Sequence, residues 1–256
     1  RTAAPIGRKC LFNLGGELAI ITKAGLVTMT EVMTGPGSAD QDIHLTRNIA
    51  PTFNQSARNY GANFGWQVLI HPRGTMGIAN IPIVEGDQAH QYVWNTLTGA
   101  WCRFKSVPAI SWTLLNDKPY CGGPSGVVYE FDVTNADAGA AIIGDVRPAF
   151  SYLGRRGMRK HFHLAKPIIV ADAAVSLSVD LEVDYQESPQ NNSVSLSGSA
   201  GTDWDAGDWD SFDWAGGSTI SQNPYGVSGL GDAASLRIRS STSNVQVALN
   251  AMSLYY

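Results

Sequence analysis

Residues 175–185, VSLSVDLEVDY, carry the pattern that decides the fold of this chain. The odd-numbered positions, from Val175 to Tyr185, are all aliphatic or aromatic, whereas the even-numbered positions are Ser, Asp or Glu. Successive side chains of a β-strand point to opposite faces of a sheet, so this uninterrupted alternation predicts a strand. We expect one face of the strand to pack on a hydrophobic core and the other, with Asp180 and Glu182, to meet water.

The composition is that of a sheet-rich protein that can bury a substantial core. Hydrophobic residues make up 44% of the 256 residues and charged residues only 16%, below the ~25% typical of soluble domains. Glycine occurs 27 times, which favours tight turns. The net charge of −4, without a long basic block, argues against sequence-independent binding of nucleic acid through clustered Lys and Arg.

Short apolar runs bounded by turn residues continue the β pattern along the rest of the chain. Three of these runs are WQVLIH (66–71), QYVWN (91–95) and VVYEFDV (127–133). Runs of ~5 residues at a spacing of ~8–12 residues predict an all-β sandwich, barrel or propeller. A strand, a glycine turn and a second strand recur at residues 17–29, 91–104 and 118–131. This repetition favours a propeller.

The sequence predicts no helix with a defined start and end. Residues 26–32 (LVTMTEV) predict a strand, and residues 38–63 predict either a short helix or a long loop. The small, polar segment 134–141 (TNADAGAA) predicts a linker. We therefore expect an all-β chain in two parts, with propeller-like antiparallel strands in residues 1–140 and a β-sandwich-like module in residues 141–256.

Cysteine usage and hydropathy exclude several classes of protein. Cys10, Cys102 and Cys121 are odd in number and widely spaced, which argues against a disulfide framework and a CxxC zinc site. We expect them to be reduced, buried thiols. No apolar run approaches the ~20 residues of a membrane-spanning helix, so no membrane span is predicted.

Residues 203–214, DWDAGDWDSFDW, combine five Asp with three Trp and one Phe, and they are the main candidate for binding. A calcium site would use Asp203, Asp205 and Asp208 around Gly207, because carboxylates on a glycine-turned loop are typical calcium ligands. However, the glutamate that ends an EF-hand loop is absent. A pair of these Asp residues would also suit glycoside hydrolysis, although nothing singles out one of them as a proton donor.

The three tryptophans of this segment favour a role in contacts. Trp204, Trp209 and Trp214 recur every five residues. Aromatic faces beside carboxylates suit carbohydrate, which would make the segment part of an adhesin. The favoured interpretation is that these residues anchor the segment in its own module or in a neighbouring subunit, with Asp residues capping turns.

A small basic cluster precedes the alternating strand. It contains Arg155, Arg156, Arg159 and Lys160. We favour a structural or interface role for it, with a phosphate contact as the alternative. His161 and His163 follow at a spacing that could share a metal, but no third ligand is visible, so neither a metal nor a cofactor is predicted. The chain also lacks GxSxG, HExxH and phosphate-binding loop motifs, and no catalytic residue is predicted.

Several of these segments, taken in order, resemble one known family. They are YVWNTLTGAWCRF (92–104), YCGGPSGVVYEFD (120–132), residues 150–184 from FSYLGRRGMRKHFHLAKP to LEVDY, and residues 204–214 with 234–256. In this order they resemble structural proteins of the tail hub or nozzle of short-tailed bacteriophages. In that class a propeller-like body is followed by a strand module and a Trp/Asp loop.

The resemblance implies a non-enzymatic virion protein located in the phage tail. It implies a homo-oligomeric ring of six copies that contacts other tail proteins, such as the adaptor and a fibre. DNA would pass through the lumen during ejection without specific binding, which agrees with the mildly acidic charge. The start at Arg1 and the length of 256 residues imply the C-terminal part of a longer protein. The rival hypotheses are a carbohydrate-binding adhesin that uses residues 203–214 and, below it, a polysaccharide depolymerase.

Overall fold

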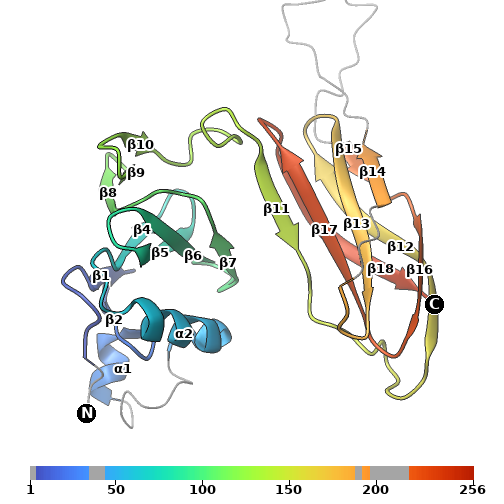
Figure 1. Cartoon of the computed structure of the whole chain (residues 1–256), viewed down its shortest axis with the longest axis horizontal. Helices are drawn as coiled ribbons and strands as arrows, with labels where there is room; N and C mark the ends of the chain where they lie inside the picture. Colours follow the sequence, from blue (N-terminus) through green and yellow to red (C-terminus); the bar gives the residue numbers. More distant parts are fainter. Residues whose placement is uncertain (1–3, 35–43, 188–191, 197–218) are drawn as a thin grey trace, which may run out of the picture. The chain divides into compact units, whose positions relative to one another are not determined.

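The computed structural model describes residues 4–34, 44–187, 192–196 and 219–256. The chain is built mainly from antiparallel β-sheets, which confirms the all-β prediction. It divides into two compact units, Arg1–Val133 and Thr134–Tyr256 (Figure 1). The predicted linker, residues 134–141, opens the second unit.

The first unit contains three antiparallel sheets whose strands follow one another in sequence order. The first sheet consists of β1 (Leu11–Leu14), β2 (Glu17–Ile21) and β3 (Leu26–Thr28). The second consists of β4 (Gln67–His71), β5 (Met76–Val84), β6 (Gln88–Asn95) and β7 (Trp101–Phe104). The third consists of β8 (Ser111–Leu115), β9 (Lys118–Gly122) and β10 (Val128–Glu130). The three repeated segments of the sequence form the last two strands of each sheet, so they occupy equivalent positions.

The first strands of the three sheets lie next to one another, because β4 contacts both β1 and β8. Lys9, just before β1, pairs in parallel with Gln67 at the start of β4. The Gln67 side chain in turn donates a hydrogen bond to the Trp112 carbonyl of β8 (2.7 Å) and accepts one from the Trp112 backbone N–H (3.0 Å). Burial differs between the strands: β3 is wholly buried and β5 almost so, whereas all three residues of β10 are exposed.

Two helices depart from the predicted strands and turns of the first unit. The predicted strand over residues 26–32 was wrong beyond Thr28, where α1 (Met29–Thr34) begins. The Glu31 carboxylate accepts the Thr28 N–H and Thr28 Oγ1 accepts the Glu31 N–H, both at 3.3 Å. This reciprocal pair is a capping box, which starts a helix within a run that otherwise favours a strand.

The second helix, α2 (Ala50–Tyr60), follows the 3₁₀ turn Arg47–Ile49. It falls in the stretch for which a short helix or a long loop was predicted, and it has a proline in its first turn. Phe53 of α2 is fully buried and packs edge-on against Trp66, with ring centroids 6.0 Å apart. The helix is thus held by the core of the first unit.

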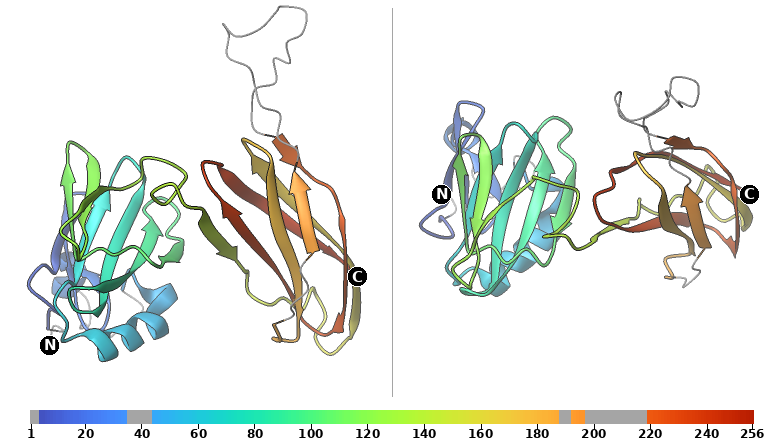
Figure 2. Two further views of the ribbon diagram at one scale, coloured as in Figure 1. Left: turned by 45° about the horizontal axis from the view of Figure 1, so that its top comes forward. Right: turned by 90° about the horizontal axis from the view of Figure 1, so that it is seen from above.

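The second unit consists of two four-stranded sheets that face each other (Figure 2). One sheet has the order β11 (Ile142–Val146), β17 (Ala234–Thr242), β13 (Val175–Val183) and β14 (Asn192–Leu196). In the other, β12 (Lys160–Ala171) pairs with β15 (Thr219–Ser221), β16 (Tyr225–Gly231) and β18 (Val247–Tyr255). Apolar residues of both sheets, among them Phe162, Leu181 and Leu236, form a single core.

The alternating stretch forms β13, as predicted, with Val175, Leu177, Val179 and Leu181 buried in this core. Two details of the prediction were wrong. Tyr185 lies beyond the strand, in a turn with φ of 64°, and is 63% exposed instead of buried. Asp180 and Glu182, expected to meet water, are 0% and 1% exposed, because arginine side chains cover them.

Candidate functional site: a basic and aromatic groove

The predicted basic cluster forms part of a groove at one end of the second unit. The groove has a volume of about 640 Å³. It is lined by Leu153, Gly154, Arg155, Met158, Arg159, Lys160, His161 and Tyr256. Residues 153, 154 and 157 all have positive φ, so the chain turns sharply before it enters β12. None of the lining side chains carries a carboxylate, whereas Arg155, Arg159 and Lys160 bring positive charge to the groove.

Lys160 supports this turn from inside. It is 6% exposed, and its Nζ donates hydrogen bonds to the carbonyl oxygens of Arg155 (2.8 Å), Met158 (3.0 Å) and Asp232 (3.3 Å). The same ammonium lies 5.9 Å from the centroid of the Tyr256 ring. Because an ammonium has three donors, Lys160 has no N–H left for a phosphate or any other ligand. Its charge still adds to the positive potential of the groove.

The three arginines differ from Lys160, because all of them are exposed. Arg156 lies over the Tyr152 ring, with its guanidinium carbon 4.7 Å from the ring centroid, which is a cation–π contact. Arg155 makes a long contact with Met158 Sδ at 3.8 Å. Within the part of the chain that the structure describes, Arg159 has no ion pair within hydrogen-bonding distance. Arg155 and Arg159 therefore retain guanidinium N–H groups for a partner.

Tyr256 lines the groove, and Tyr152, next to the lining residue Leu153 in the chain, belongs to a further group of aromatic side chains. The rings of Phe150 and Tyr185 lie 4.5 Å apart, and the Tyr152 and Tyr185 hydroxyls are 3.3 Å apart. Tyr256 donates its hydroxyl hydrogen bond to the Leu153 carbonyl (3.0 Å), yet the residue is 57% exposed. Exposed aromatic rings beside free arginines are typical of surfaces that bind a partner rather than of catalytic sites.

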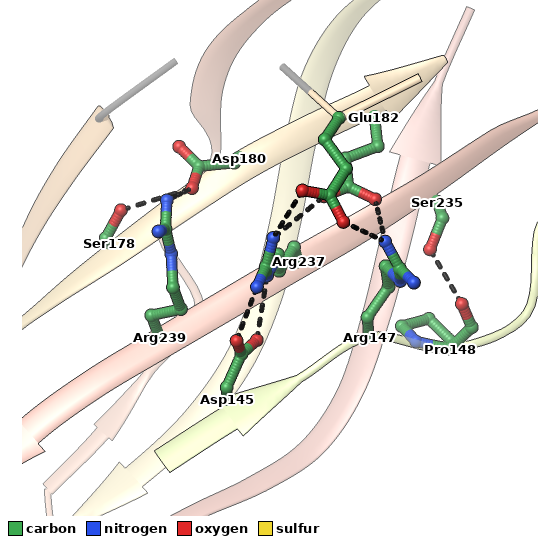
Figure 3. Close-up of polar contacts among 10 residues, drawn as sticks. Asp145, Arg147, Pro148, Ser178, Asp180, Glu182, Ser235, Arg237 and Arg239 are labelled. Carbon is green, nitrogen blue, oxygen red and sulfur yellow. Dashed lines mark hydrogen bonds and ion pairs between the residues drawn. The ribbon is translucent and has the colours of Figure 1, made fainter. Parts of the chain in front are cut away.

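The outer face of the β11–β17–β13 sheet carries a separate network of ion pairs (Figure 3). Arg237 binds Asp145 through two hydrogen bonds, Nε to Oδ1 at 2.8 Å and Nη2 to Oδ2 at 2.6 Å. It also contacts Glu182, 3.4 Å away, to which Arg147 donates a second hydrogen bond of 2.9 Å. The hydrogen bonds that Arg237 donates to Asp145 lower the pKa of Asp145 and raise the pKa of Arg237.

Arg239 completes this network by pairing with Asp180 from the neighbouring strand. Each buried carboxylate thus has an arginine partner, which explains how acidic side chains can be buried on this strand. Neither Asp180 nor Glu182 is placed like the acid or base of a hydrolase, since both are held in ion pairs. The network is a structural feature of the sheet.

Of the other predicted site residues that the structure describes, His161 alone belongs to the groove. His161 and His163 are both exposed on one face of β12, and only His161 lines the groove. Among the described residues, no three His, Cys, Asp or Glu side chains come together as a metal site. Cys10 and Cys121 are buried free thiols, whereas Cys102 is exposed, contrary to the expectation. Burial raises the pKa of the Cys10 and Cys121 thiols.

The Trp/Asp segment lies outside the described residues. This applies to Asp203, Trp204, Asp205, Asp208, Trp209 and Trp214. The described chain ends before it at Leu196 of β14 and resumes after it at Thr219 of β15.

A polar pocket in the first unit was not predicted from the sequence. This pocket, of about 170 Å³, lies between α2 and strands β5–β7. The hydroxyls of Ser56 and Tyr92 meet in it at 2.7 Å, and His90 and Arg103 also line it. Burial, followed by the charges of Arg103 and Lys105, lowers the pKa of His90. The residues come from four separate elements, so no local motif could have identified them.

Comparisons with known proteins add no family assignment. A scan against protein-family models finds no match, and a search of curated proteins finds none either. In the described segments of the chain, no helix combines the length and hydropathy needed to cross a membrane.

Proposed function

We propose that the chain is a non-enzymatic structural protein of the tail of a short-tailed bacteriophage, and forms part of the hub or nozzle ring through which DNA is ejected. The proposal starts from the resemblance of residues 92–104, 120–132 and 150–184 to that class. The observation that carries it is the arrangement of the first unit, in which three meanders follow one another with their first strands in contact.

This arrangement is what an arc of a β-propeller requires. Propeller blades are antiparallel meanders around an axis, and the first strand of each blade lies innermost, next to those of its neighbours. β1, β4 and β8 have these contacts. In two of the three sheets the last strand, β7 or β10, is the most exposed, whereas β3 of the first sheet is buried. The repeated hairpins occupy the same place in each meander, which supports repetition by blade.

The second unit supports a role in assembly. Ion pairs between neighbouring segments stabilise its outer sheet face. Its basic, aromatic groove has the composition of a contact surface. A tail component needs rigid modules and surfaces for neighbouring subunits, and both features meet that need. The chemistry of the groove favours a macromolecular partner over a small substrate.

Gold labelling of phage particles tests the proposal. Antibodies raised against the purified chain would be applied to particles from the bacterium that carries the gene, with pre-immune serum as control. We expect gold at the short tail, and we expect the purified chain to leave polysaccharide layers intact. Gold that is absent from tails, or clearing of polysaccharide by the purified chain, would contradict the proposal.

A further inference from the structure

We propose that the groove binds the acidic, tryptophan-rich segment 203–214 of a second copy of the chain. The inference deepens the proposed role in a ring by naming one contact between neighbouring subunits, and it rests on that role for its biological meaning. Three observations carry it: the charge of the groove, the exposed aromatic and sulfur groups in it, and the place where the segment leaves the fold.

The charges of the two surfaces are complementary. Arg155 and Arg159 have free guanidinium N–H groups in a groove whose lining side chains include no carboxylate, although Asp184 is close enough for its charge to interact with that of Arg159. Residues 203–214 carry five Asp and no Lys or Arg. Arginine pairs with carboxylate through two parallel hydrogen bonds, which gives such a contact both direction and strength. Attraction between the two surfaces is therefore expected to depend on salt.

The apolar groups of the two surfaces also match. The groove presents Met158, which is 51% exposed, and Tyr256, which is 57% exposed. The segment supplies Trp204, Trp209 and Trp214 between its Asp residues. Tryptophan is the best cation–π partner for arginine and packs well on methionine sulfur, so an alternating Asp/Trp segment can use both kinds of group at once.

The strand register places Leu196 and Thr219, the described residues that flank the segment, at the end of the second unit opposite the groove. Leu196, after which the segment follows, pairs with Val175, and Thr219, which follows it, pairs with Ala171. Ala171 is the last residue of β12, whereas Lys160, at the groove, is its first. A strand of 12 residues spans ~36 Å at ~3.3 Å per residue.

This separation favours a second copy as the source of the segment. Trp209 lies ten positions before Thr219, and ten residue steps reach at most ~36 Å when fully extended. Trp209 would therefore need a fully extended chain to reach the groove of its own copy. If the segment of one copy binds the groove of the next, the contact joins two different surfaces of identical chains and is therefore heterologous. Repetition of such a contact builds a ring if it closes and a filament if it does not.

Charge reversal in the full chain tests the contact. One variant carries Arg155→Glu with Arg159→Glu, and a second carries Asp205→Lys with Asp208→Lys. We expect the wild-type chain to self-associate in sedimentation velocity, each variant alone to remain monomeric, and an equimolar mixture of the two to associate again. Arg58→Glu with Arg73→Glu, two exposed arginines of the first unit, is the matched control and should behave as wild type.

A peptide of residues 201–216 covers the case in which the wild-type chain is monomeric at accessible concentrations. Fluorescence anisotropy should show saturable binding of the labelled peptide to the full chain. We expect at least tenfold weaker binding after the groove reversal and after Trp209→Ala in the peptide. Absence of peptide binding would overturn the inference, as would a mixture of variants that does not associate at concentrations at which the wild-type chain does. Equal binding of the peptide by the wild-type chain and by the Arg155→Glu/Arg159→Glu variant would also overturn the inference. So would displacement of the peptide by single-stranded DNA whose phosphate concentration equals the carboxylate concentration of the peptide.

The outcomes for the contact and for the tail are separable. A chain that self-associates through the groove but is absent from phage tails would contradict the proposed function and leave the contact intact. If gold labels the phage tails but the Arg155→Glu/Arg159→Glu variant associates like the wild-type chain, only the proposed contact is contradicted.

Discussion

At the scale of the residue, two basic side chains that look alike in sequence have different roles. Lys160 is buried and donates to three carbonyls, while Arg159, its neighbour, is exposed. Lys160 is the first residue of β12, whereas Arg159 still belongs to the loop that precedes the strand. The basic cluster thus contains one buried lysine that stabilises the turn and three exposed arginines.

Replacing Lys160 with Met tests the first of these roles. The change leaves three backbone carbonyls without their donor, so we expect the free energy of unfolding to fall by about 1–3 kcal/mol. Lys166→Met on the same strand is the control and should change it by about 0.5 kcal/mol or less. Urea denaturation gives both values. Equal losses in the two variants would mean that the hydrogen bonds of Lys160 do not stabilise the turn.

The ion pair between Arg237 and Asp145 predicts a dependence of stability on pH. Because Arg237 lowers the pKa of Asp145 in the folded chain, this stabilisation is fully present above the ordinary Asp pKa of ~3.9. It is lost as the pH falls through the lowered value. We expect the melting temperature to drop below about pH 4, and Asp145→Asn to reduce the slope of that drop. Thermal melts between pH 7 and 2.5 would show an unchanged slope if the pair is not formed.

Removing Arg237 should be costly at neutral pH. Arg237→Gln leaves the 1% exposed Glu182 with a single arginine, and loss of one partner from a buried ion pair typically costs ~3–5 kcal/mol. Arg147 still contacts Glu182, so we expect a value at or below the lower end of that range. Arg73→Gln in the first unit is the control for a change of charge alone. Denaturation curves that superimpose for both variants would contradict the role of Arg237.

At the scale of the element, the strands were predictable and the starts of the helices were not. The alternation of residues 175–183 and the glycine turns after β2, β6 and β9 are local patterns, and the structure places strands there. α1 depends on the reciprocal bonds of Thr28 and Glu31, a signal of two residues within an apolar run. Burial of Asp180 was also hidden, because its partner Arg239 is 59 residues away in sequence.

The turns of the repeated hairpins make a further prediction. Gly25 and Gly99 both have positive φ and occupy equivalent turns. A Cβ at Gly99 would meet nothing within 4 Å, so Gly99→Ala should cost only the backbone strain of ~1–2 kcal/mol. At Gly25 the Cβ would lie 2.5 Å from His44 Nδ1, and we expect Gly25→Ala to cost more. Denaturation of the two variants should rank them in this order, and the reverse order would contradict the described packing.

At the scale of the whole molecule, the chain has two parts with separate cores. Phe53 and Ile81 belong to a core of the first unit, and Leu181 and Leu236 belong to the core of the second. Sequence composition indicated two parts, because a short polar segment interrupts the β pattern. The groove could not be inferred in the same way, since residues 153–161 meet Tyr256 only after β12 and β18 have paired.

Separate cores predict two thermal transitions. Leu181→Ala should lower the melting temperature of one transition and Ile78→Ala that of the other, each with a loss of about 2–5 kcal/mol. Both residues are 1% exposed or less, so the two substitutions are matched in burial. Differential scanning calorimetry measures both effects. A single transition that both substitutions shift would mean that the two units unfold together.

The ion pairs on the outer sheet face also favour one register of β17 against β13. Arg237 and Arg239 alternate along β17 with Leu236 and Ile238, which point into the core. If β17 slipped by one residue against β13, both arginines would enter the apolar interior and Asp180 and Glu182 would lose their partners. Such a misaligned sheet would bury several uncompensated charges at once. The charges that cover this face therefore select one alignment of the central strands over its nearest competitors.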